Sequence, residues 1–272
     1  MPATTVNASQ TAKRSAIPVR TITNADANAA LREGWADFME MRGDLIFVGL
    51  IYALVGIVAA TAIMGGPLLA LLFPILAGVG LLGPVAALGF YEMARRRESG
   101  LQSNWQHFLD VRKRPGANEI GVVAALLLAI FVAWIFVASG LYLALFGWWE
   151  PPSIGAFLAR VFTTPEGWAL IVIGNAIGLG FAALVLGISV VSLPMLVDCD
   201  LSASQAVSTS WRAARENPGV MFRWGVIVAA LLVLGSIPFF VGLAAVLPWL
   251  GYATWHLYTK LVDRSAIRSR SD

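Results

Sequence analysis

Long runs without charge limit what this chain can fold into. Four segments contain no Asp, Glu, Lys or Arg: Leu45–Tyr91, Ile120–Trp149, Gly167–Val197 and Trp224–Thr259. A helix needs ~20 apolar residues to cross a bilayer, so the first and last segments can each fold back as a hairpin of two spans, and the other two can each hold one span. Only 13% of the chain is charged, about half of the ~25% that is usual in soluble proteins. The sequence therefore predicts an all-α polytopic membrane protein with six transmembrane helices.

Turn-forming residues place the ends of these helices. Gly65-Gly66-Pro67 separates the first two spans, and Gly235-Ser236-Ile237-Pro238 separates the last two. A short helix at Ile154–Phe162 is expected in the loop between spans three and four. The expected spans are Leu45–Met64, Leu68–Met93, Ile120–Phe146, Trp168–Leu193, Gly219–Gly235 and Phe239–Thr259.

A polar, helix-forming segment, Leu193–Gly219, separates two of the apolar runs. Ser202 and Gln205 have the spacing of a capping box, and Pro218 disfavours helical geometry at the residue before it. Between them, Ala203, Ala206, Val207, Trp211 and Ala214 have the spacing of one helical face. An amphipathic helix with Trp on its apolar face is expected to lie flat at the membrane interface.

The same pattern occurs twice earlier in the chain. Trp35 and Trp105 precede apolar runs as Trp211 does, within expected interfacial helices at Asp26–Arg42 and Gly100–Arg114. The sequence thus predicts one interfacial helix followed by two spans, repeated three times. Each tryptophan ring is expected to lie among apolar side chains or lipid tails.

The distribution of basic residues predicts the orientation. Of the 19 Lys and Arg, only Arg160 falls in a loop on the far side, so both termini and all three interfacial helices are expected to be cytoplasmic, in a bacterial inner membrane. The net charge of +3 reflects these membrane-flanking residues and does not indicate a nucleic-acid partner. We expect a disordered tail at 1–23, a membrane domain at 24–264 and a short tail at 265–272.

Two polar groups of the chain could support chemistry. Asp198 and Asp200 could hold a divalent cation, or they could be turn acids favoured by the dipole at the start of the helix that follows. Cys199, the only cysteine, could act as a nucleophile, but no residue is identifiable as the base that would activate it. His107 and His256 could be axial haem ligands or could simply be packed or solvated. We predict no catalytic residue, no bound metal and no cofactor.

Other features allow two interpretations each. Asn175 is expected to make an interhelical hydrogen bond, with a substrate contact as the alternative. Pro74 and Pro84 break the second span, which indicates either close packing or a transport site. No charged residue lies in the middle of any span, which argues against an ion pump. Six basic residues could bind anionic lipid headgroups or only set topology: Arg95, Arg96, Arg97, Arg112, Lys113 and Arg114.

The segment SLPMLVDCDLSASQAVSTSWRAARENPGVMFRWG resembles a family of uncharacterised bacterial integral membrane proteins with a domain of unknown function. The resemblance extends from about Arg20 to Arg264, and some members are labelled as cytochrome c oxidase subunits. It implies a fold and a location but no mechanism, and no haem or copper ligands are arranged in the spans here. The residues of the family motif are Pro194, Met195, Asp198, Asp200, Ala206, Ser210, Trp211, Asn217 and Pro218.

Three classes of function follow from these features. The first is a non-enzymatic accessory, assembly, lipid-binding or partner-binding membrane protein, associated with a respiratory complex or another membrane protein complex. The second is a small-molecule or lipid transporter. The third is a membrane-embedded metal-dependent enzyme that uses Asp198 and Asp200. The sequence does not identify a substrate, a partner or an oligomeric state.

Overall fold

A computed structural model describes residues 17–41, 54, 57, 72–114, 116–238 and 240–268. The span expected at Leu45–Met64 lies almost wholly outside these residues. The part of the chain that the structure describes is helical and has no strand. A single antiparallel bridge joins Val19 to Val262. Three of the described helices are long and apolar enough to cross a membrane: Ala117–Phe146, Pro165–Asp198 and Pro218–Ser236.

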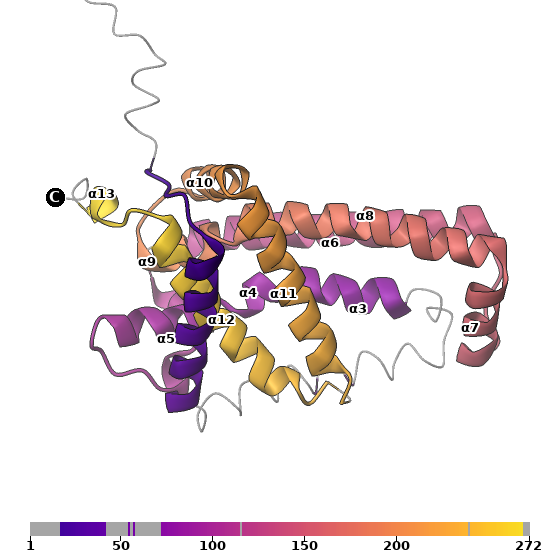
Figure 1. The fold of residues 1–272 in the computed structure, drawn as a ribbon, viewed down its shortest axis with the longest axis horizontal. Helices are drawn as coiled ribbons and strands as arrows, with labels where there is room; N and C mark the ends of the chain where they lie inside the picture. Colours follow the sequence, from indigo (N-terminus) through magenta and orange to yellow (C-terminus); the bar gives the residue numbers. More distant parts are fainter. Residues whose placement is uncertain are drawn as a thin grey trace, which may run out of the picture.

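The longest element is a hairpin of two helices. α6 (Ala117–Phe146) and α8 (Pro165–Ser189) lie side by side, and α7 (Ile154–Thr163) caps their far end (Figure 1). The Gly174–Gly178 spacing predicted for close helix approach is used here, because a β-carbon on Gly178 would stand 3.3 Å from the Trp134 ring of α6. The remaining faces of α8 are largely exposed.

A second hairpin crosses the first obliquely. It consists of α11 (Pro218–Ser236) and α12 (Leu243–Leu261) (Figure 1). Span six was expected to start at Phe239, but the helix starts at Leu243, after a turn in which Phe240 has a positive φ of 64°. α12 buries Tyr252 and Trp255 almost completely, so its C-terminal half is part of the protein core.

The second expected span is broken into three helices. α3 (Leu72–Leu81), α4 (Gly83–Ala86) and α5 (Leu88–Glu98) are separated at Leu82 and Ala87. Pro84 lies in the first turn of α4, where a missing N–H costs little. The break predicted from the prolines is therefore confirmed, and the Trp134 indole donates a hydrogen bond to the Pro74 carbonyl.

Two of the three expected interfacial helices form. One occupies residues 24–41 and the other is α10 (Ala203–Glu216), which has the predicted Ser202–Gln205 capping box. Ala203 and Ala206 of the predicted apolar face are buried, together with Thr209, Ser210 and Ala213, whereas Trp211 is 41% exposed. The indole ring of Trp211 lies over Gly187 of α8.

The continuous helix expected at Gly100–Arg114 is wrong. The chain forms two 3₁₀ turns there, η2 (Trp105–His107) and η3 (Asp110–Lys113). The Asn104 side chain accepts the Gln106 N–H, and the Asp110 carboxylate binds side chains from both turns. Such local side-chain bonds compete with helix formation. Only two of the three tryptophan-bearing segments are therefore α-helices, and the repeat is not confirmed.

The protein core lies at the end of the molecule away from α7 (Figure 1). There α5, α9 (Ser192–Asp198), α10, α12 and the helix at 24–41 pack together. Residues 17–23 differ from the expected disordered tail, because they lie extended against this core. The Asn217 side chain accepts the Ile22 N–H at 2.8 Å, and Arg20 pairs with Asp263. The largest fully buried side chains are Trp224, Trp255, Tyr252, Tyr258, Phe90 and Met93.

Candidate functional site

Asp198 does not begin a helix. It is the last residue of α9, where the helix dipole disfavours negative charge, so the interpretation as a dipole-favoured turn acid is wrong for this residue. Its carboxylate accepts two hydrogen bonds from Arg264, at 2.7 and 3.1 Å, and one from the Tyr258 hydroxyl at 2.9 Å. The Asp198 side chain is 5% exposed. The buried Asp198 carboxylate therefore forms a structural ion pair with Arg264.

Arg264 connects this carboxylate to a second one. Its guanidinium also pairs with Glu98 at the end of α5 and lies 5.7 Å from the centre of the Trp255 ring. The Trp255 indole donates to the same Glu98 carboxylate at 3.0 Å. We call Glu98, Asp198, Trp255, Tyr258 and Arg264 the polar junction, because they join α5, α9 and α12.

Cys199 and Asp200 follow the polar junction in sequence. Burial, together with the negative charge of Asp198, raises the pKa of the Cys199 thiol to about 11. This thiol is therefore almost fully protonated at neutral pH and is a poor nucleophile. Asp200 is exposed, two residues before the cap of α10. Within the described ranges, no three or more His, Cys, Asp and Glu side chains gather as metal ligands.

The two histidines belong to separate ion-pair groups. His107 contacts Asp110 at 2.7 Å. His256 contacts Asp37 at 2.7 Å and Glu33 at 3.3 Å. The structure thus places each imidazole against carboxylates and does not bring the two together as a ligand pair.

A buried carboxylate organises part of the basic cluster. Glu92 is 1% exposed and accepts two hydrogen bonds from Arg95, at 2.9 and 2.7 Å. The two residues are three positions apart in α5, a spacing that favours such ion pairs on a helix. Arg96 and Arg114 lie 3.9 Å from the same carboxylate.

Two more of the six basic residues have acidic partners. Arg97 pairs with Asp37 at 3.1 Å, and Lys113 pairs with Asp110 at 2.7 Å. The bonds from Lys113 and His107 lower the pKa of Asp110 to about 2. For Arg112 we find no acidic partner within the part of the chain that the structure describes.

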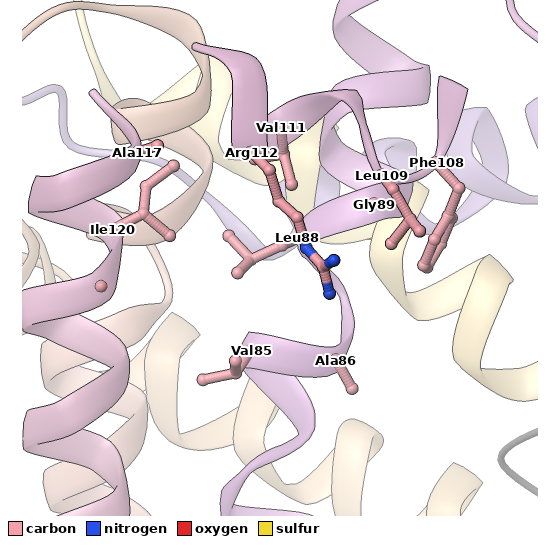
Figure 2. Close-up of a pocket in the computed structure, with 11 residues that line it drawn as sticks. Val85, Ala86, Leu88, Gly89, Phe108, Leu109, Val111, Arg112, Ala117 and Ile120 are labelled. Carbon is pink, nitrogen blue, oxygen red and sulfur yellow. The ribbon is translucent and has the colours of Figure 1, made fainter. Parts of the chain in front are cut away.

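Arg112 lines a hollow of about 410 Å³ between α4, α5, η3 and the start of α6. Figure 2 shows its guanidinium lying among Leu88, Gly89 and Ala86. Apolar residues form the rest of the wall. The sequence predicts a cluster of basic residues around Arg112. It does not predict that Arg112, unlike the other basic residues of the cluster, lies over an apolar hollow.

Several residues of the predicted motif lie at joints between helices. The Ser210 hydroxyl accepts the buried Val191 N–H at 3.2 Å, where the chain passes from α8 to α9. Asn217 ends α10, and its side chain bonds to Ile22, Arg20 and Ala213. Pro194 is buried within α9, and Pro218 occupies the first turn of α11. These positions fix the path of the chain in the core.

Within the described residues, Asn175 makes no interhelical hydrogen bond of the expected kind. Its side chain donates to the Ile171 carbonyl of its own helix at 2.7 Å and is exposed. No local motif links Asp198 to Tyr258 or Arg264, because these residues are 60 and 66 positions away from it in the chain.

Comparison with known proteins supports the membrane assignment. No curated protein matches the chain, and no solved structure matches it. The match to a family model ends at Asp198, so Ser210, Trp211, Asn217 and Pro218 lie beyond it. The resemblance seen in the sequence is confirmed: residues 72–198 match the family described as "Predicted integral membrane protein (DUF2189)", whose function is unknown.

Proposed function

We propose that this chain is a non-enzymatic binding protein of the bacterial inner membrane, an accessory or assembly factor that binds lipid or a membrane partner. The observation that supports this is the state of its acidic groups. Asp198 and Glu92 are buried and saturated by arginine and tyrosine donors. General acid–base catalysis needs a carboxyl group that reaches substrate and exchanges a proton. Asp198 instead joins α9 to Tyr258 of α12 and to Arg264, and Glu92 holds Arg95 of its own helix.

The proposed topology has six spans and both termini in the cytoplasm. The polar junction and the basic residues around Glu92 lie at the core end, while α7 lies at the other (Figure 1). This asymmetry agrees with the positive-inside rule. Reporter fusions after Arg114 and after Asp272 should read cytoplasmic, and a fusion at Ser153 should read external. An external C-terminus would rule out this topology.

Purification of the full chain in a mild detergent tests the binding function. Mass spectrometry should find a defined lipid or membrane protein that remains bound at a fixed ratio. Asp200→Asn should retain the same bound species, because Asp200 is exposed and outside the polar junction. Turnover of a substrate that requires a divalent metal and is lost in Asp200→Asn at unchanged stability would contradict the proposal. An association with a respiratory complex, which rests on the resemblance alone, predicts oxidase subunits among the bound proteins.

A transporter is the second candidate, because α3, α4 and α5 form a broken helix beside α6. Broken helices line binding sites in many transporters. Flux of a solute into vesicles that contain the purified protein, absent from empty vesicles, would favour this candidate over the binding function.

A further inference from the structure

Two hollows on one side of α6 form a single furrow. The hollow at Arg112 and a second one of about 460 Å³ share Val85 and Ala86 of α4. We call their combined lining the α4–α6 furrow. Its α6 wall consists of Ala117, Ile120, Gly121, Ala124, Ala125 and Leu128, which lie on one face of the helix.

The furrow has the dimensions and the lining of a hydrocarbon site. From Ile120 to Leu128 it follows α6 for about 12 Å at 1.5 Å per residue. That is most of the ~15 Å thickness of one leaflet's hydrocarbon layer. Gly121, Ala124 and Ala125 are small residues that project little from α6, so they leave space in the furrow along this wall. A β-carbon on Gly121 would meet nothing within 4 Å.

Among the described residues, Arg112 is the only charged side chain that lines the furrow, and it lies at the end where α6 begins. The nearest acidic residues in sequence are engaged elsewhere. Asp110 binds Lys113 and His107, and Glu119 accepts the Ala203 N–H at 2.6 Å. α6 is one of the three candidate spans, so a residue just before it lies at headgroup depth. An arginine here can bind a phosphate oxygen pair through its planar fork of donors.

We propose that the α4–α6 furrow is a site for an anionic phospholipid, whose phosphate binds Arg112 and whose acyl chain lies along Gly121, Ala124 and Leu128. This inference rests on the proposed lipid-binding function and specifies its ligand and location. Charge complementarity identifies the headgroup, and the apolar walls select a lipid over a free anion.

The experiment uses the full chain in nanodiscs that contain equal amounts of phosphatidylglycerol and phosphatidylcholine. Native mass spectrometry after release measures how much of each lipid stays bound. The wild type should retain phosphatidylglycerol preferentially. Arg112→Gln should reduce the preference about fivefold, the contribution expected from one basic residue near a membrane surface. Lys113→Gln is the matched control, because Lys113 is adjacent, exposed and outside the furrow.

A second pair of variants tests the acyl chain. Gly121→Leu should fill the furrow and lower total retained lipid, whereas Gly140→Leu should not. Both glycines are exposed on α6 with open space around them, but only Gly121 lines the furrow. The thermal stability of all four variants, measured in the same detergent, shows whether each is folded. If Gly121→Leu does not fold, the smaller substitution Gly121→Ala takes its place.

Three results would overturn the lipid site. They are equal effects of Arg112→Gln and Lys113→Gln, retention in Gly121→Leu equal to that in Gly140→Leu, and complete displacement of phosphatidylglycerol by millimolar inorganic phosphate. If these occur while a membrane protein still co-purifies, only the lipid site fails. Solute flux or metal-dependent turnover would instead contradict the proposed function.

Discussion

Gly34 lies so close to Ala253 that a β-carbon on Gly34 would stand 2.4 Å from the Ala253 backbone nitrogen. The space that a side chain at Gly34 would occupy is therefore filled by the backbone of α12, so the two helices are in direct contact at this point. The contact is extended by Trp35, whose ring meets the Trp249 ring edge-on at 5.0 Å between centres. A glycine is required here because neither backbone can move without disturbing the core.

Gly34→Ala should therefore lower the free energy of unfolding by about 1–3 kcal/mol, the range for overpacking a tight contact. Gly140→Ala, at an open position within α6, should instead raise it by up to about 1 kcal/mol from helix propensity. The measurement is thermal unfolding of both variants in one detergent. Equal melting temperatures would show that the two helices are not in contact.

Asp198→Asn should destabilise the protein far more than Asp200→Asn. Removing one partner of a buried ion pair leaves the Arg264 charge without its main partner, which costs about 3 kcal/mol. Asp200 is exposed, so its replacement should change stability by less than about 0.5 kcal/mol.

Arg264→Gln, alone and combined with Asp198→Asn, completes a double-mutant cycle for this pair. The cycle should show that the effects of the two substitutions are strongly non-additive. Additive effects would mean that the two side chains do not interact, whatever the separate cost of each substitution.

Cys199 should react slowly with a water-soluble maleimide at neutral pH. The thiolate is the reactive form, and the raised pKa of about 11 keeps the thiol protonated. The rate should rise about tenfold per pH unit from pH 7 to pH 10, without the plateau near pH 9 that a thiol of ordinary pKa (~8.5) would show.

Removing the Asp198 charge should lower the Cys199 pKa, since that charge opposes the thiolate. In Asp198→Asn the plateau should therefore move to lower pH. A uniform increase in rate with no change in the pH profile would indicate only greater exposure of Cys199.

Asn217→Ala should release the segment at 17–23 from the core. The Asn217 side chain is 3% exposed and bonds to Ile22, Arg20 and Ala213, so its loss leaves buried backbone groups without partners, at about 2–3 kcal/mol. Trypsin should then cleave after Arg20 at least tenfold faster than in the wild type.

Asn217→Asp is the graded variant and Asn118→Ala the control. Asp can still accept the Ile22 N–H but cannot donate to the Arg20 carbonyl, so an intermediate cleavage rate is expected. Asn118 is exposed on α6, and its replacement should leave cleavage unchanged. Cleavage that is equally fast in all three variants would show that Asn217 does not hold the segment.

Local sequence chemistry predicts the elements that depend on neighbours in the chain. The apolar run from Ile120 predicts α6, and the Ser202–Gln205 pair predicts the start of α10. The same reasoning fails at Gly100–Arg114. There the apolar spacing suits a helix, but Asn104 and Asp110 form competing local bonds, whose outcome spacing alone does not reveal.

The polar junction could not be predicted, for a different reason. Asp198, Glu98 and Arg264 carry no local pattern, and they meet only because α5, α9 and α12 are packed together. The segment at 17–23 is similar. Its polar composition is typical of a disordered tail, yet its backbone finds partners in Asn217 and Val262. Long-range pairing of this kind depends on the fold and not on residue type.

The contacts of residues 17–28 also determine when the protein can be completed during synthesis. This segment is synthesised well before the residues that hold it, which are Arg212, Asn217, Arg223 and Val262. The segment must therefore remain undocked until the chain has been made at least to Val262. A chain truncated before residue 217 would leave it exposed to proteolysis in the cell.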